Sequence, residues 1–123
     1  MIIETGVDAV EIARVAKSLQ RPGFLERFFS EEERAYFQSK NNAPQTVAGH
    51  FAAKEAFSKA MGTGLSGFEL REAGVVHDSR GKPYLSLTGA AAKLAEGWSF
   101  SLSITHTGTT AIAFVAAWRE DDR

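Results

Sequence analysis

The stretch HFAAKEAFSKAMGTG, His50 to Gly64, combines small, aromatic and charged residues at helical spacing. It predicts a helix that begins near Thr46, and the glycines of the closing GTG can turn the chain out of it in a left-handed conformation. At 100° per residue, Phe51 and Phe57 lie on different sides of this helix. We therefore expect a central helix that contacts the core on more than one side.

Glu55 and Lys59 lie one turn apart on a face of this helix lined by small residues. Such a pair is most often an ordinary ion pair that stabilises a helix by only ~0.2–0.5 kcal/mol. The small neighbours also leave room for a ligand, or equally for another helix or strand. Spacing alone favours the ion pair and leaves the ligand site open.

The whole chain of 123 residues has the size and composition of one α+β domain, residues 1–123. Its content of 44% hydrophobic residues supplies a core, and its net charge of -1 argues against broad binding to nucleic acid. No apolar run approaches the ~20 residues of a membrane helix, so no membrane association is expected. The absence of Cys excludes disulfides and thiolate chemistry and fits a reducing compartment.

Outward from the central helix, hydrophobic periodicity and turn residues predict strands and shorter helices. Ser30 and Glu33 form a capping-box pattern, and Thr88 is a candidate helix cap. The predicted order is a strand at 2–7, a helix after Asp8, a small helix at 24–29, a helix at 30–38, a hairpin around DSRGKP, a helix at 88–96 and a C-terminal hairpin of SFSLSITH and AIAFVAAW, with a frayed tail REDDR.

Three polar residues are candidates for chemistry. Asp8 and Glu55 could hold Mg²⁺ together with waters and substrate phosphates, and Lys59 could then act as a cation or a base. Asp8 is otherwise a helix cap or turn residue, and His106 is otherwise a structural histidine. No spacing rule joins these residues.

Four ordered blocks carry a resemblance over nearly the whole chain: GVDAVEIARV (6–15), FAAKEAFSKAMGTG (51–64), GKPYL (81–85) and SLSITHTGTTAIAFV (101–115). In these blocks the chain resembles the holo-[acyl-carrier-protein] synthases, the small bacterial type of 4′-phosphopantetheinyl transferase. The resemblance implies a single α+β domain in which a mostly antiparallel sheet packs against the long central helix. It also implies a homotrimer that binds coenzyme A in clefts between subunits.

The implied reaction is Mg²⁺-dependent transfer of the phosphopantetheine arm of coenzyme A to a serine of apo-acyl carrier protein. It releases adenosine 3′,5′-bisphosphate and supplies fatty acid biosynthesis, which implies a cytoplasmic enzyme. By resemblance, Asp8 and Glu55 match metal ligands, and Lys59 matches a catalytic diphosphate contact. The implied coenzyme A contacts are Lys59, Gly62, Gly81, Lys82, Pro83, His106, Thr107 and His50, and the implied carrier-docking residues are Arg14, Arg21 and Phe24.

One position departs from the family pattern, because His50 stands where an Arg that contacts a nucleotide phosphate often precedes FAAKEA. The base that deprotonates the serine stays open among a metal-bound water, Glu55 and a neutral Lys59. Two other functions also stay open: a coenzyme A-binding module without turnover, and a plain trimeric scaffold.

Overall fold

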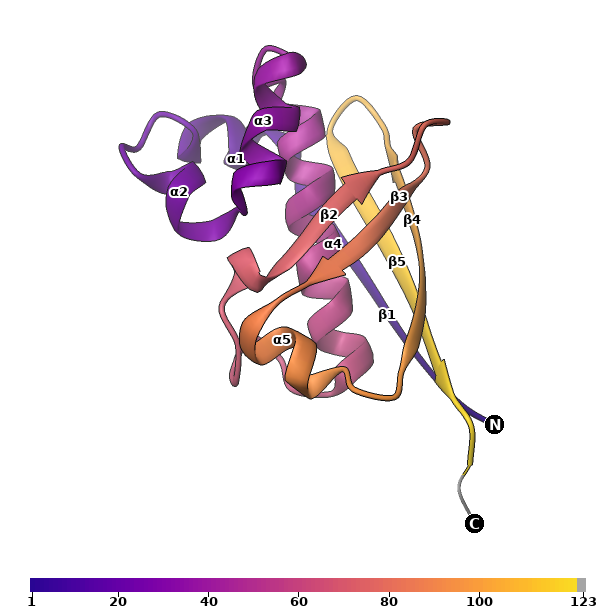
Figure 1. Ribbon diagram of the computed structural model, residues 1–123. Helices are drawn as coiled ribbons and strands as arrows, with labels where there is room; N and C mark the ends of the chain where they lie inside the picture. The colour runs from indigo at the N-terminus through magenta and orange to yellow at the C-terminus, as the bar shows by residue number, and fades with distance from the viewer. Residues whose placement is uncertain (122–123) are drawn as a thin grey trace.

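A long helix, α4 (Pro44–Met61), runs through the centre of the computed structural model, which describes residues 1–121 (Figure 1). The helix starts two residues earlier than expected because Pro44 fits its first turn, and Gly62 ends it at φ 73°. Eleven of its 18 residues are buried, so the expected contact with the core on several sides is confirmed. Residues 122–123 of the tail, expected to fray, lie outside the described part.

A three-stranded antiparallel sheet covers one side of α4, in the order β1 (Ile2–Glu11), β5 (Thr110–Arg119) and β4 (Ser99–His106) (Figure 1). The predicted C-terminal hairpin is confirmed. The first strand was predicted too short: it continues past Val7 because its backbone pairs with β5 as far as Glu11 opposite Thr110. Asp8 therefore lies within the strand and not at a strand-to-helix junction.

The sheet approaches α4 closely because both surfaces carry small side chains. The inner face of β5 is Ala111, Ala113, Val115 and Ala117, all fully buried. On β1, a Cβ added at Gly6 would lie 1.9 Å from the carbonyl oxygen of Ala56. Glycine at position 6 thus allows the strand backbone to touch the helix backbone.

Three short helices lie beside the N-terminal part of α4, on the side away from the three-stranded sheet: α1 (Ile12–Ser18), α2 (Phe24–Phe28) and α3 (Glu31–Ser39) (Figure 1). Phe29 joins these helices in an apolar cluster separate from the one between α4 and the sheet. Its ring centroid lies 5.0 Å from that of Phe37 and 6.3 Å from that of Phe51. The predicted capping box is confirmed, since the Glu33 amide donates to Ser30 Oγ and the Ser30 amide donates to Glu33 Oε1.

The predicted hairpin around DSRGKP is also confirmed as β2 (Ala73–His77) and β3 (Pro83–Leu87), which form a separate two-stranded sheet. The 3₁₀ helix η1 (Leu70–Glu72) precedes it and α5 (Gly89–Leu94) follows. Thr88 occupies the cap position of α5 but makes no side-chain capping bond, contrary to expectation. The carboxylate of Glu72 takes that place and accepts from the amide of Ala90 at 3.2 Å.

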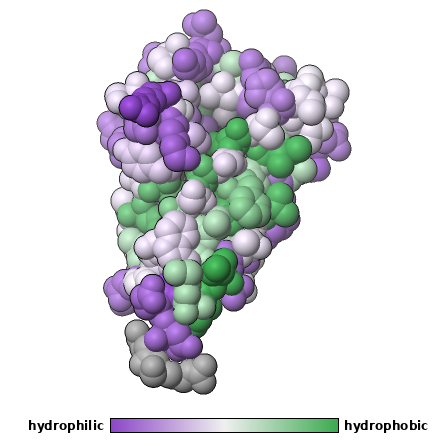
Figure 2. Space-filling view, turned by 90° about the vertical axis from the view of Figure 1, so that its right-hand side faces the viewer, coloured by the Kyte–Doolittle hydropathy of each residue, from purple (hydrophilic) through white to green (hydrophobic). Residues whose placement is uncertain are grey.

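Over β1 and β5 the outer face of the three-stranded sheet is largely apolar and lacks a covering layer in the single chain (Figure 2). Ile3 is 62% exposed, and the cross-strand partners Val7 and Phe114 are 54% and 44% exposed. Within residues 1–121, none of the helices has the length and apolar character needed to cross a membrane.

Candidate active site

Asp8 and Lys59 meet where β1 crosses α4. Lys59 Nζ donates to Asp8 Oδ1 and to the carbonyl oxygen of Val7, both at 3.0 Å. The Asp8 side chain is 14% exposed and that of Lys59 is 53% exposed. Among the described residues, the ion pair of Lys59 is with Asp8, so the ordinary Glu55–Lys59 helix pair is not the arrangement adopted.

Glu55 lies beside this pair on α4. Partial burial, followed by the negative charge of Asp8, raises the pKa of Glu55 above its ordinary value, although Lys59 opposes the shift. Two carboxylates are therefore close enough to repel each other. A cation between them would relieve this repulsion.

The two carboxylates line one hollow of about 420 Å³, together with Glu11, Arg14 and Phe51. No group of three or more His, Cys, Asp or Glu side chains that could enclose a metal occurs in the part of the chain described. Mg²⁺ commonly takes one or two carboxylates and completes its shell with waters and substrate phosphates. The donor set of Asp8 and Glu55 fits that kind of open site.

A second hollow, of about 200 Å³, lies beside the first two turns of α4. Its walls bring together residues from the GKP and THT segments, which are Gly81, Pro83 and His106, with His50 and His77 beside them. Lys82 and Thr107 belong to the adjoining turns: the Lys82 amide donates to Asp78 Oδ1, and Thr107 Oγ1 accepts from the amide of Thr110. Gly62 lies elsewhere, in a hollow of about 380 Å³ that Lys59 also lines.

His50 is only 2% exposed, and both of its ring nitrogens have protein partners. Its Nδ1 lies 2.9 Å from Glu33 Oε2, and its Nε2 lies 3.0 Å from His77 Nε2. Burial, followed by the charges of His77 and Lys54, lowers the pKa of His50 even though Glu33 opposes the shift. This geometry differs from the phosphate contact that the resemblance implies for position 50.

Glu33 and Lys54 form the buried part of this network, a role that their sequence positions did not predict. Lys54 Nζ donates to Glu33 Oε1 at 2.5 Å, to Leu70 O at 3.1 Å and to Ala73 O at 2.9 Å. Burial lowers the pKa of Lys54 against the attraction of Glu33. Burial alone would raise the pKa of Glu33, but the hydrogen bond from His50 and the charge of Lys54 outweigh it and lower that pKa.

The sequence carried only a weak signal for these residues. Glu33 already had a local explanation as the capping-box acid, and Lys54 adjoins Glu55 without a recognisable partner nearby. Their contact joins positions 21 residues apart, and His50 and His77 are 27 residues apart. A fully buried position for a lysine in an Ala-rich helix is visible only once the helix is packed.

Of the three expected docking residues, one lies at the carboxylate hollow. Arg14 of α1 is exposed and lines the hollow itself. Arg21 is exposed in the turn after α1. Phe24 is half-buried and packs edge-on against Phe28 and Phe29, with ring centroids 5.4 and 5.9 Å apart. Most of its contacts are therefore within its own apolar cluster.

Comparison with known proteins identifies the family of the chain. The model of the 4′-phosphopantetheinyl transferase superfamily matches residues 4–115. The chain is 47% identical to a holo-[acyl-carrier-protein] synthase of Treponema denticola, over 94% of this chain and 97% of that protein. It is 41% identical to one from Clostridium botulinum, over 93% of this chain and 95% of that protein.

Solved structures of such enzymes share the fold. An ACPS–CoA complex from Chronobacterium ammoniagenes has a TM-score of 0.85 at 34% identity, covering 98% of this chain and 100% of that chain. The Helicobacter pylori holo-[acyl-carrier-protein] synthase in complex with coenzyme A has a TM-score of 0.82 at 32% identity, covering 93% and 99%. Sequence and fold lead to the same assignment: the chain belongs to the 4′-phosphopantetheinyl transferase superfamily.

Proposed function

We propose that this chain transfers the 4′-phosphopantetheine arm of coenzyme A to a serine of apo-acyl carrier protein, in a Mg²⁺-dependent reaction that serves fatty acid biosynthesis in the cytoplasm. The observation that carries the proposal is that Asp8 and Glu55, from two elements far apart in the sequence, line one open hollow while Lys59 donates to Asp8. The close relatives and the coenzyme A complexes of similar structures support the choice of substrates.

The reaction has a simple balance. The serine oxygen bonds to the phosphorus that carries the pantetheine, and the bond from that phosphorus to the bridging oxygen breaks. The products are holo-acyl carrier protein and adenosine 3′,5′-bisphosphate, and the serine proton passes to a base. Negative charge rises on the phosphoryl and leaving oxygens, so stabilisation of that charge is the main task of the site.

The side chains divide this task between them. Asp8 and Glu55 would hold Mg²⁺, which when bound neutralises charge on the diphosphate. Lys59 donates to Asp8 and to Val7 O, and its half-exposed ammonium adds a second positive charge at the edge of the hollow. Lys59 thus orients Asp8 and serves as a cation for a phosphate oxygen.

The hollow at Gly81, Pro83 and His106 is suited to the nucleotide end of coenzyme A. It combines the apolar walls of Pro83 and Ile104 with the imidazole of His106, which can contact a base or a phosphate. Gly62 and Lys59 line the hollow at the C-terminal end of α4, where the pantetheine arm of coenzyme A can continue from the diphosphate. Lys82 and Thr107 flank the nucleotide hollow on its two turns.

The open face of the three-stranded sheet supports assembly. Ile3, Val7 and Phe114 expose a band of apolar surface on neighbouring strands (Figure 2). Contiguous apolar patches of this kind commonly mark protein interfaces. A homotrimer of this chain would cover the face and place the coenzyme A sites at the clefts between subunits.

Carrier docking is proposed at the rim of the carboxylate hollow. Arg14 lines it and Arg21 is exposed in the turn after α1, so an acidic carrier would meet positive charge near the metal pair. Phe24 contributes from a half-buried position.

The proposal is tested by incubating the chain with coenzyme A, Mg²⁺ and apo carriers from fatty acid and polyketide pathways, and weighing the carriers. A mass increase of one phosphopantetheine is expected, with none for a carrier whose acceptor serine is replaced by alanine. If coenzyme A binds but no carrier is modified, the chain is a coenzyme A-binding module without turnover. If coenzyme A does not bind, the chain is a scaffold. Either result overturns the transferase.

A further inference from the structure

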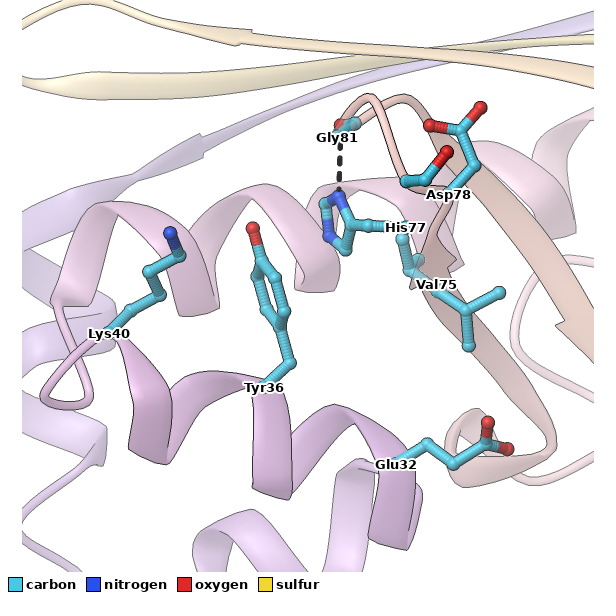
Figure 3. Close-up of a pocket in the computed structure, with 9 residues that line it drawn as sticks. Glu32, Tyr36, Lys40, Val75, His77, Asp78 and Gly81 are labelled. Carbon is cyan, nitrogen blue, oxygen red and sulfur yellow. Dashed lines mark hydrogen bonds between the residues drawn. The ribbon is translucent and has the colours of Figure 1, made fainter.

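A continuous chain of hydrogen bonds runs from α3 through α4 to the turn between β2 and β3. Glu33 Oε2 contacts His50 Nδ1, His50 Nε2 contacts His77 Nε2, and His77 Nδ1 contacts the carbonyl oxygen of Gly81 at 3.2 Å. Figure 3 shows the last contact, with the ring of Tyr36 beside that of His77. The Tyr36 and His77 rings stack with centroids 4.0 Å apart.

The acceptors at its two ends fix the number of hydrogens in this series of hydrogen bonds. Glu33 Oε2, as a carboxylate, and Gly81 O only accept, so His50 Nδ1 and His77 Nδ1 must both carry hydrogen. The contact between the two Nε2 atoms needs one further hydrogen. Three hydrogens on two imidazoles leave the pair with one positive charge, because two neutral imidazoles carry only two.

Burial decides which ring holds the extra proton. His50 is 2% exposed and has the ammonium of Lys54 close by, bonded to the same carboxylate. His77 is half-buried at the edge of a hollow that opens to solvent. A charge costs less at the rim than in the interior. His50 is therefore neutral with hydrogen on Nδ1, and His77 is the imidazolium.

The groups around His77 are compatible with this charge. Glu32 and Lys40 of the α3 region and the neighbouring Asp78 line the same hollow of about 430 Å³, giving two carboxylates against one ammonium (Figure 3). From α4 the facing group is His50, and from β4 it is His106, which shares the smaller hollow. The electron-rich face of Tyr36 also favours a cation against it.

We propose that His77 is a positioning residue for the nucleotide end of the coenzyme A site, where its doubly protonated ring ties the turn at Gly81 to helix α4 through His50. The inference rests on the proposed function, because it assigns coenzyme A to the hollow bordered by Gly81 and Pro83. His77 acts through the turn that shapes this hollow.

The proposal predicts a specific dependence on pH. When His77 loses one proton, either Gly81 O loses its donor and faces a nitrogen lone pair, or the two Nε2 atoms lose their shared hydrogen. One hydrogen bond is lost in both cases. The KM for coenzyme A should then rise about five- to tenfold, while kcat, corrected for the pH profile of the reaction itself, stays unchanged within about twofold.

The first experiment does not require activity. The chain has three His, so ¹⁵N-labelled protein gives three imidazole ring systems, and His106→Asn identifies one of them. At about pH 6, both ring nitrogens of His77 should be protonated and His50 should show hydrogen on Nδ1 alone. A neutral His77 at this pH, or a His50 with hydrogen on Nε2 only, overturns the inference whatever the protein catalyses.

The second experiment separates positioning from general structural support. His77→Phe keeps a ring against Tyr36 but no donor, and should show a KM for coenzyme A about five- to tenfold higher at pH 6 that no longer rises with pH. His77→Asn has neutral N–H donors at every pH and should recover most of the pH 6 affinity with a flat profile. The rise of KM with pH should persist in His106→Asn.

The outcomes distinguish two failures. If His77→Phe lowers kcat and thermal stability with no change in KM, or if His77→Asn keeps the wild-type profile, the positioning role is wrong while the transferase stands. If no carrier is modified, the proposed function fails, and the imidazole spectra still decide the protonation of His77.

Discussion

Lys54 and Glu55 are neighbours in the sequence and have opposite surroundings. Lys54 is fully buried, and each of its three N–H groups has an acceptor from α3, η1 or β2. Glu55 is half-buried on an open hollow, and its pKa is raised by burial and by Asp8. The charge of Lys54 has its partners within the fold, and we propose that the charge of Glu55 is paired with a bound ligand.

The difference separates structural from functional charge on one helix. A buried ion pair contributes little net stability, but removing one partner is expensive because the other charge is left unpaired. Glu55 beside Asp8 is the opposite case. Removing its charge relieves repulsion in the free protein and so does not destabilise the fold, but it removes one carboxylate from the proposed site. Charge alone in the KEA segment does not distinguish these roles; the partners do.

The largest expected effect is on turnover. Glu55→Gln keeps the shape of the side chain but removes its charge, so carrier modification should fall on the order of 10³-fold at saturating Mg²⁺, and Asp8→Asn should do the same. Carrier mass spectrometry gives the rate, and circular dichroism should show an unchanged fold. Wild-type turnover in either variant would remove that carboxylate from the site.

The matching change at the neighbouring residue should act on stability. Lys54→Met leaves Glu33 buried without its cation and leaves the Leu70 and Ala73 carbonyls without a donor, so the free energy of unfolding should fall by about 3–5 kcal/mol. Urea denaturation measures the loss. Lys59→Met is the control: its side chain is 53% exposed, and its removal should cost less than about 1 kcal/mol. Equal losses would show that Lys54 has no special structural role.

Gly6→Ala tests how the carboxylate pair is assembled. The added methyl group would meet the Ala56 carbonyl, so β1 must move away from α4, which should cost about 1–3 kcal/mol of unfolding free energy. Because Asp8 moves with the strand, turnover should fall as well. Gly108→Ala is the control for stability, since a Cβ there meets no atom within 4 Å. A fully active and stable Gly6→Ala would show that the close contact is unnecessary.

The smallest effect concerns the pH dependence of stability without metal. The raised pKa of Glu55 means that the folded chain binds more protons than the unfolded one between the ordinary and the raised value. Its contribution is therefore full at low pH and is lost as pH rises through the folded pKa. At pH 7 in chelator, Glu55→Gln should be more stable than wild type by less than about 1 kcal/mol. A lower melting temperature would contradict this account.

The sequence predicted most elements because their signals are local. The alternation in SFSLSITH, the capping box of Ser30 and Glu33 and the glycines after Met61 each depend on neighbouring residues. The length of β1 was missed because its end is set by pairing with β5, about a hundred residues away. Thr88 was misassigned because a carboxylate from η1 occupies the expected cap.

Prediction of the candidate site was uneven for the same reason. Asp8, Glu55 and Lys59 came from a resemblance, and the contact of Lys59 with Asp8 could not be derived from spacing, which offered Glu55 as its partner. His77 gave no signal at all. Its role depends on a ring from α3, a nitrogen from α4 and a carbonyl from the following turn.

The pairing of β1 with β5 has a consequence for the order of synthesis. All ten residues of β1, including the one that carries the Asp8 carboxylate, find their strand partners only in residues 110–119. A chain emerging from the ribosome can form α4 and its buried lysine long before β5 exists. The proposed metal pair of Asp8 and Glu55 can therefore be completed only after β5 is made, so we expect a nascent or prematurely ended chain to be inert toward coenzyme A until that strand is in place.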